Sequence, residues 1–415
     1  MSKLKSIDLF AGCGGLSLGL EQAGFETVFV NELHPDAMKT FLQNRPKSNL
    51  SDPKNHVLDI KSLTKNKDSL QSFGKYIGKE HGEIDLVCGG PPCQGYSGIG
   101  HRRTFDLDKR EMPTNHLYKD MAKVVATIAP KMFLFENVRG LLNSRWTAEG
   151  EKGEIWNDVR KTFKNITVKV GKQEFQYQIG FKLVFAKEFG VPQNRPRILM
   201  VGLREDIDFE FTSKDTSRGL LPEGFGDAPD LKDLFSDLID PKWRDRKETT
   251  VYLKDPTTEI QESLRTMQNG KLMMKGDMLS EQEYSNHSDA VIAKFQYMIE
   301  HDSEIPESMR TKKFSQKVLP KIWGENGPSI TATSLPDDYV HFSQPRVLTV
   351  REWARLQMFP DWYQFAGKRT TGGRRRAGDP DAGDWTREVP KYTQIGNAVP
   401  VGLAKEVGLH FNKIL

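Results

Sequence analysis

The sequence predicts an α/β protein with a doubly wound, mostly parallel β-sheet and a second, smaller domain. Over the first two hundred residues, short apolar runs alternate with amphipathic helical patterns, which is typical of β-α-β units. From residue 206 to residue 345 the alternation fades, and polar, charged and loop-forming residues dominate. A chain of 415 residues is long enough for two domains. We therefore expect one domain of residues 1–205 plus 346–415, and a smaller one of residues 206–345.

Seven apolar runs are the predicted strands, and helical patterns lie between several of them. The strands read KSIDLF (5–10), ETVFVN (26–31), NHVLDI (55–60), EIDLVCGG (83–90), KMFLFENV (131–138), KLVFAK (182–187) and RILMVGL (197–203). The clearest helical patterns cover 15–24, 116–130, 349–359 and 394–414. In such a fold, ligands bind at the edge where the strands have their carboxyl ends.

The bulk composition is that of an ordinary water-soluble protein. Mean hydropathy is −0.58, and no apolar run is long enough for a membrane span. The start, MSKLKSIDLFAG, lacks the apolar core of a signal peptide. Cys13, Cys88 and Cys93 form neither a disulfide framework nor a CxxC metal pattern. We expect a cytoplasmic protein with free thiols and no metal, whose net charge of +4 permits a polyanionic partner.

A glycine-rich turn follows the first predicted strand in DLFAGCGGLSLGL. Gly12, Gly14 and Gly15 allow close backbone approach, and a helix N-terminus offers free N–H groups. Glu32 ends the second strand, where a carboxylate can accept hydrogen bonds from ribose hydroxyls. Asp59 ends the third. A glycine turn alone could be a close-packed corner, but together with two acids it predicts an adenosine-bearing ligand, either NAD or S-adenosylmethionine.

Cys93 lies just past the fourth strand in GGPPCQGYS, residues 89–97. Pro91 and Pro92 stiffen the chain before the thiol, and glycines free it afterwards. Roughly twenty polar residues then precede the next helix, longer than a usual strand-helix loop. A buried structural thiol needs neither feature, and that interpretation suits Cys13 and Cys88. We expect Cys93 to be a nucleophile beneath a moving loop.

Two further groups of polar residues lie near strand ends. Glu136 and Asn137 end the fifth strand in FENV, and Arg195 and Arg197 precede the last strand in QNRPR. Taken alone, the glutamate could be an ordinary salt-bridge partner, and the arginines could be solvated.

Together these segments resemble the DNA (cytosine-5)-methyltransferase family, of the bacterial modification type. The matches, in family order, are DLFAGCGG, Glu32, Asp59, GGPPCQGYS, ENV, QNRPR, RVLTVREWARLQMFPD and QIGNAVPVGLA. They cover roughly the first 205 and the last 70 residues. The resemblance implies a Rossmann-like, S-adenosylmethionine-dependent methyltransferase domain, with residues 206–345 as the target-recognition domain.

The resemblance also implies roles for individual residues. Cys93 would add to C6 of cytosine, Glu136 would hydrogen-bond N3, and Arg197 would hold O2, with Arg195 in the same catalytic set. The cofactor residues implied are Phe10, Ala11, Gly12, Gly14, Gly15, Leu16, Glu32, Asp59, Ile60, Pro92, Leu117, Asn397 and Val399. The residues expected to contact DNA are Gln94, Ser97, Arg102, Arg103, Arg374, Arg375 and Arg376.

The expected function is therefore site-specific methylation of cytosine C5 in double-stranded DNA, on a base turned out of the helix. We expect a monomer in the bacterial cytoplasm, held at the nucleoid through DNA, and paired with a cognate restriction endonuclease without a stable complex. The alternatives are a tRNA cytosine-5 methyltransferase and a non-catalytic nucleic-acid-binding relative. A nicotinamide oxidoreductase would explain the glycine turn but not the Pro-Cys-Gln loop.

Overall fold

The chain forms two compact units. The computed structural model describes residues 3–92, 109–226, 228–310, 316–321, 328–330, 338–371 and 388–415. Unit 1 comprises Met1–Phe185, Pro196–Phe225 and Leu403–Leu415, and unit 2 comprises Ala186–Arg195 and Gly226–Gly402. By compactness, residues 206–225 therefore belong with the sheet, and residues 346–402 belong with unit 2. The assignment of target recognition to residues 206–345 stays a prediction.

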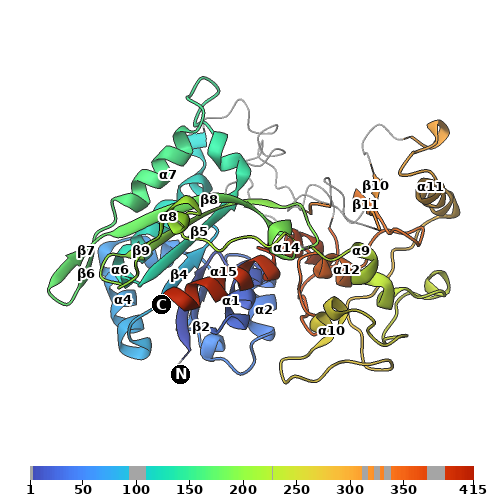
Figure 1. Cartoon of the computed structure of the whole chain (residues 1–415), viewed down its shortest axis with the longest axis horizontal. Helices are drawn as coiled ribbons and strands as arrows, with labels where there is room; N and C mark the ends of the chain where they lie inside the picture. Colours follow the sequence, from blue (N-terminus) through green and yellow to red (C-terminus); the bar gives the residue numbers. More distant parts are fainter. Residues whose placement is uncertain are drawn as a thin grey trace. The chain divides into compact units, whose positions relative to one another are not determined.

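Unit 1 is built on a seven-stranded sheet with strand order β3-β2-β1-β4-β5-β9-β8 (Figure 1). The strands are β1 (Leu4–Leu9), β2 (Phe25–Asn31), β3 (His56–Val57), β4 (Leu86–Gly89), β5 (Met132–Val138), β8 (Tyr177–Phe185) and β9 (Pro196–Arg204). β1 to β5 pair in parallel, and β9 runs antiparallel to both of its neighbours. The seven predicted strands and the mostly parallel sheet are confirmed. A hairpin of β6 (Val168–Val170) and β7 (Gln173–Phe175) was not predicted.

Helices cover both faces of this sheet. They are α1 (Gly15–Gln22), α2 (Pro35–Gln43), α3 (Lys61–Thr64), α4 (Lys67–His81), α6 (Leu117–Ile128), α7 (Glu154–Lys164), α8 (Ser213–Ser217) and α15 (Val401–Ile414). Successive side chains of a strand point to opposite faces. Phe29 of β2 packs on Phe73 of α4, whereas its neighbour Val30 packs with Met38 and Phe41 of α2. The predicted doubly wound arrangement is confirmed.

The helix predicted over residues 394–414 is broken in two. α14 (Lys391–Asn397) ends at Ala398, whose ψ of 147° is extended, and α15 begins at Val401. Pro400 explains the break, because proline has no N–H and disfavours helical backbone in the residue before it. Within unit 1, α15 packs against the end of α1, where Asn412 donates a hydrogen bond of 2.8 Å to the carbonyl of Ala23.

Unit 2 is held together by buried ion pairs rather than by a large sheet. Its elements are α9 (Leu231–Phe235), α10 (Glu259–Arg265), α11 (Asp289–Glu300), β10 (Lys317–Val318), β11 (Tyr339–Val340), α12 (Val350–Arg355) and α14. The guanidinium of Arg355 lies 2.7 Å from Asp237 and 2.6 Å from Asp361, and all three side chains are fully buried. Removing one partner of such a pair is strongly destabilising, so these pairs fix α12 to the segments around it.

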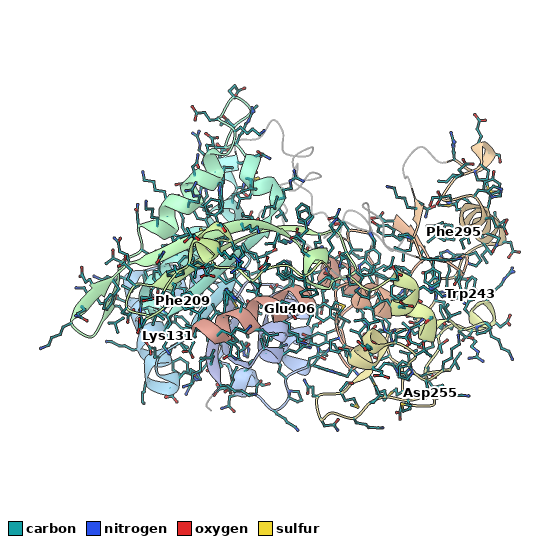
Figure 2. All side chains as sticks on the ribbon, in the orientation of Figure 1. Lys131, Phe209, Trp243, Asp255, Phe295 and Glu406 are labelled. Atoms are coloured by element: carbon teal, nitrogen blue, oxygen red, sulfur yellow. The ribbon has the colours of Figure 1, made fainter. Side chains whose placement is uncertain are left out.

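An apolar core of unit 2 lies around α11, where Phe295 packs with Met298, Val340 and Val347. Figure 2 labels Phe295. In the described part of the chain, no helix combines the length and apolarity that crossing a bilayer requires.

Candidate active site

The turn after β1 adopts a backbone that few residues tolerate. Gly12 has φ 58° and Gly14 has φ 87°, and even Phe10 has φ 60°. A bulky residue in this left-handed region is an outlier that structures keep at functional sites. Two hydrogen bonds to Asn31 of β2 hold the turn: Ala11 N–H to its carbonyl at 2.9 Å and Phe10 N–H to its side-chain oxygen at 3.3 Å.

Glu32 faces this turn from the end of β2. Its carboxylate accepts hydrogen bonds of 2.8 Å from the Gly12 N–H and 2.8 Å from the His34 N–H. Burial raises the pKa of Glu32, and the bond from His34 acts in the opposite direction. A Cβ built on Gly12 would meet nothing within 4 Å, so space is open beside the turn. An oriented carboxylate beside an open glycine turn fits the ribose of an adenosine-type ligand.

Asp59 lies two residues past the end of β3, not at the strand end that the sequence predicted. It is exposed, and its carboxylate accepts a hydrogen bond of 2.9 Å from the Lys61 N–H at the start of α3. Leu33 and Leu58, which sequence analysis missed, flank the two acids with exposed fractions of 57% and 43%. Each leucine is next to a predicted strand-end acid in the sequence, and this position could have identified both as candidate site residues. Two acids and two exposed leucines suit a ligand with polar and flat apolar parts.

The other predicted cofactor residues fall into three groups. Gly15, Leu16 and Ile60 are buried, so they could offer only backbone groups. Pro92 is exposed, whereas Leu117 is half-buried and packs against the main core of unit 1. In unit 2, Asn397 is exposed and Val399 is half-buried, on either side of the helix break. Their contact with a cofactor stays a prediction.

Glu136 and Arg197 form a pair at the carboxyl end of β5. The guanidinium Nε of Arg197 lies 2.6 Å from a carboxylate oxygen of Glu136, and the two side chains are 10% and 12% exposed. The antiparallel register places Arg197 opposite Val138, so β9 brings the arginine to this end of β5. A carboxyl group and a guanidinium side by side offer complementary contacts to adjacent nitrogen and oxygen atoms of a pyrimidine.

The segment that leads to Cys93 lies directly against this pair. A Cβ built on Gly90 would come within 2.6 Å of a carboxylate oxygen of Glu136. The side-chain amide of Asn137 donates a hydrogen bond of 3.1 Å to the carbonyl of Pro91. The backbone two residues before Cys93 is therefore fixed beside Glu136. Cys93 and the predicted DNA contacts lie outside the described residues, namely Gln94, Ser97, Arg102, Arg103, Arg374, Arg375 and Arg376.

The other two cysteines are buried structural thiols, as the sequence predicted. Cys13 and Cys88 are not disulfide-bonded and are fully buried. Burial raises the pKa of both thiols, so both are protonated and unreactive at neutral pH.

Arg195 has its hydrogen bonds within unit 2. Its buried guanidinium donates to the carbonyl of Ile330, to that of Gly396 at 2.7 Å and to that of Ala398 at 2.9 Å. These bonds hold the segment that carries Asn397. Lys368 and Arg369 also have protein partners, namely the carboxylate of Glu388 and the carbonyl of Glu283.

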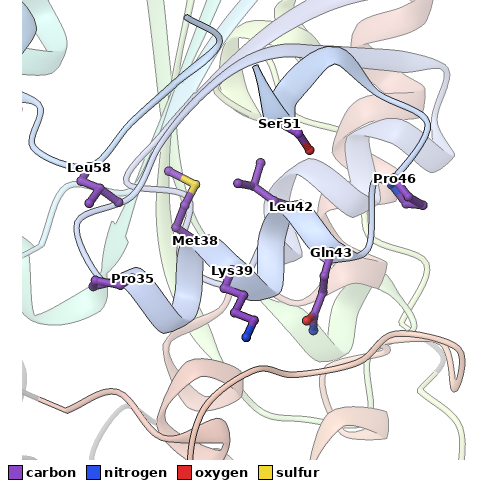
Figure 3. Close-up of a pocket in the computed structure, with 8 residues that line it drawn as sticks. All are labelled: Pro35, Met38, Lys39, Leu42, Gln43, Pro46, Ser51 and Leu58. Atoms are coloured by element: carbon purple, nitrogen blue, oxygen red, sulfur yellow. The ribbon is translucent and has the colours of Figure 1, made fainter. Parts of the chain in front are cut away.

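A cavity of about 570 Å³ runs along α2 (Figure 3). It is lined by Pro35, Met38, Lys39, Leu42, Gln43, Pro46, Ser51 and Leu58. Leu58, the neighbour of Asp59, lines this cavity, whereas Glu32 and Asp59 themselves do not.

Comparison with known proteins places this geometry in context. A family model described as C-5 cytosine-specific DNA methylase matches residues 4–413. The chain is 30% identical over 420 residues to the Type II methyltransferase M.XorII of Xanthomonas oryzae pv. oryzae, covering 100% of this chain and 86% of that protein. It is 28% identical over 421 residues to the Type II methyltransferase M.DdeI of Desulfomicrobium norvegicum, covering 98% and 89%.

Among solved structures, a candidate DNA modification methyltransferase encoded within a prophage (E. coli) has a TM-score of 0.66. Its sequence identity is 24% over 99% of both chains, so this likeness speaks for the fold alone.

Proposed function

Because the chain belongs to the C-5 cytosine-specific DNA methylase family, we propose that it methylates C5 of one cytosine within a specific sequence of double-stranded DNA. The observation that carries the proposal is the Glu136–Arg197 pair beside Gly90 and Pro91, at the end of the strand that leads to Cys93. A protein that only bound DNA would not need a carboxyl-guanidinium pair beside the segment that leads to a cysteine.

The methyl donor that we propose is S-adenosylmethionine. The glycine turn with open space beside Gly12, the oriented Glu32 carboxylate and the exposed Leu33 fit its adenosine part. The ring of Phe10, in its strained backbone, would face the sulfonium, because aromatic faces attract cations. When bound, this cofactor would supply an electrophilic methyl group.

Cys93 would act as the nucleophile. Its thiolate adds to C6 of the cytosine, which breaks the aromatic conjugation and makes C5 electron-rich. Glu136 would hydrogen-bond N3 and Arg197 would donate to O2, so both would stabilise the charge that addition creates. Once C5 carries the methyl group, loss of the C5 proton to solvent and departure of Cys93 as a thiolate would restore the ring. C6 cannot be reached inside a duplex, so the base must leave the stack.

We infer that Arg195 contributes by position. Its bonds to the carbonyls of Gly396 and Ala398 would hold Asn397 for the cofactor. By analogy with the Type II relatives, we propose that the enzyme protects DNA from a cognate restriction endonuclease. We also propose that it acts as a monomer.

Two experiments test the proposal in sequence. Bisulfite sequencing of DNA from a host without its own cytosine methyltransferases, expressing this chain, should reveal one methylated sequence. A duplex with 5-fluorocytosine at that position should then form a covalent complex in the presence of S-adenosylmethionine, because fluorine at C5 prevents release of the adduct. Cys93→Ser should give no complex.

Methylated DNA together with an active Cys93→Ser variant would refute the mechanism. Methylation of tRNA in preference to duplex DNA would refute the substrate.

A further inference from the structure

Arg45 is a buried cation that the proposed chemistry does not use. It follows the cap of α2, and its side chain is only 6% exposed. A charge that is removed from water is destabilising unless it is paired and hydrogen-bonded. The groups that accept hydrogen bonds from its guanidinium therefore indicate the role of Arg45.

The guanidinium of Arg45 joins α1 to α2. Its Nε lies 2.7 Å from the carboxylate of Glu21 in α1, and one terminal nitrogen donates to the carbonyl of Phe41 in α2 at 3.0 Å. The guanidinium also stacks on the ring of Phe41, 3.8 Å from its centroid. Glu21 in turn accepts a hydrogen bond of 3.0 Å from Thr27 of β2. The guanidinium of Arg45 therefore connects α1 and α2, and through Glu21 it connects them to β2, the strand that leads to Glu32.

The remaining terminal nitrogen of Arg45 reaches the glycine turn itself. It lies 3.4 Å from the carbonyl of Gly14, which also accepts the first helical hydrogen bond of α1 from Leu18 at 2.9 Å. Gly14 has φ 87°, a left-handed backbone conformation that glycine adopts readily. A donor on its carbonyl fixes the direction in which the neighbouring N–H groups of the turn point.

The charge of Arg45 also balances the acids beneath the turn. Burial raises the pKa of Asp8 and of Cys13, and the positive charge of Arg45 opposes this effect at both residues. Glu21 and Glu32 act in the other direction on Asp8. Without Arg45, the acids around the turn would repel one another with less compensation.

We propose that Arg45 is a positioning residue for the cofactor turn: by binding Glu21 and the carbonyl of Gly14 together, it holds α1 and the turn in the conformation that receives S-adenosylmethionine. This inference rests on the proposed cofactor. Lysine cannot replace it fully, because a single ammonium group cannot reproduce the planar fork.

The test is cofactor affinity, measured by isothermal titration calorimetry with S-adenosylhomocysteine, the demethylated product, and by the KM for S-adenosylmethionine. Arg45→Met should raise Kd and KM by about tenfold or more, the effect of losing a charge-assisted hydrogen bond, while kcat at saturating cofactor falls much less. Arg45→Lys should raise Kd by a smaller factor.

The matched control is Arg204→Met. Arg204 is also buried and paired, with Asp206 at 2.6 Å and Glu83 at 2.8 Å. It lies at the end of β9, beside the start of β5, whereas the glycine turn follows the carboxyl end of β1. Both methionine variants should lower the melting temperature, yet only Arg45→Met should weaken cofactor binding. Equal Kd values for Arg45→Met and the unchanged protein, or equal weakening in Arg204→Met, would overturn the proposal.

If Arg45→Met does not fold, Arg45→Lys decides: cofactor binding as tight as that of the unchanged protein overturns the proposal. If the unchanged protein binds neither form of the cofactor, the proposed function itself fails.

Discussion

Replacing Asp8 by asparagine should make the protein more stable at neutral and alkaline pH. Asp8 lies in β1, only 1% exposed, and accepts a hydrogen bond of 2.5 Å from the hydroxyl of Ser17. Burial raises its pKa from 3.8 to about 7, against the opposing effects of Ser17 and Arg45. Asparagine keeps the shape and can accept the same hydrogen bond, but it carries no charge to bury.

The magnitude follows from linkage. Between pH 4 and pH 7 the folded protein holds a proton on Asp8 that the unfolded chain has released, so the stability contributed by this proton is lost as pH rises through that window. At about 1.4 kcal/mol per pKa unit, a difference of about three units corresponds to about 4 kcal/mol. The stability of Asp8→Asn relative to the unchanged protein should therefore increase by this order up to pH 7 and remain constant above it.

The assay is urea unfolding followed by circular dichroism at several pH values between 4 and 8.5. Asp120→Asn is the control, because this buried aspartate in the same unit has the opposite shift. Burial raises its pKa, but hydrogen bonds from Lys61 and Thr64 outweigh burial and leave the pKa lowered. Asp120→Asn should lose stability at neutral pH and lose less as the pH falls toward 4. A difference between Asp8→Asn and the unchanged protein that stays constant from pH 5 to pH 8.5 would refute the reasoning.

Three further predictions concern other parts of the molecule. Gly90→Ala should lower kcat by about 100-fold with little change in melting temperature, because the new methyl group displaces the flexible Glu136 carboxylate but no backbone; an unchanged kcat would contradict this. Arg355→Met should lower the free energy of unfolding by about 3–5 kcal/mol in urea titrations, since it removes the guanidinium that bridges Asp237 and Asp361 and leaves each carboxylate with one longer ion pair, to Arg265 at 3.3 Å and to Arg351 at 3.8 Å; a shift below 1 kcal/mol would contradict it. Burial lowers the pKa of His341 to about 3, so stability is lost as the pH falls below 6.5. His341→Asn should therefore lose about 2 kcal/mol less than the unchanged protein between pH 6.5 and pH 5, and parallel acid unfolding curves would exclude this.

The strands of unit 1 were the best predicted elements, because the pattern of apolar residues along each strand reflects its burial in the sheet. The parallel strands β1 to β5 were predicted because strands buried on both faces appear as continuous apolar runs. Glu32 was predicted as a site residue from its place at a strand end, whereas the roles of Glu136 and Arg197 came from the family resemblance and stay predictions. The pairing of Glu136 with Arg197 was not predictable from periodicity, since it depends on the antiparallel register of β5 and β9.

Other features depend on contacts between distant residues and left no local signal. Arg45 looks like an ordinary charge after a helix, and only the tertiary structure shows its guanidinium against Glu21 and Gly14. The buried pair of Arg355 with Asp361 likewise looks like a solvated charge pattern in the sequence. The last predicted helix was too long because its apolar pattern continues across Pro400. The prediction followed this pattern and did not take into account that proline ends a helix.

The contact of α15 with α1 has a consequence for synthesis. Unit 1 combines Met1–Phe185 and Pro196–Phe225 with Leu403–Leu415, so its last helix is synthesised only after the residues of unit 2, Gly226–Gly402. A nascent chain thus cannot complete unit 1 before α15 has left the ribosome. A product cut short by a premature stop would leave the surface around Ala23 uncovered, and a peptide of residues 401–415 supplied separately should restore it by fragment complementation.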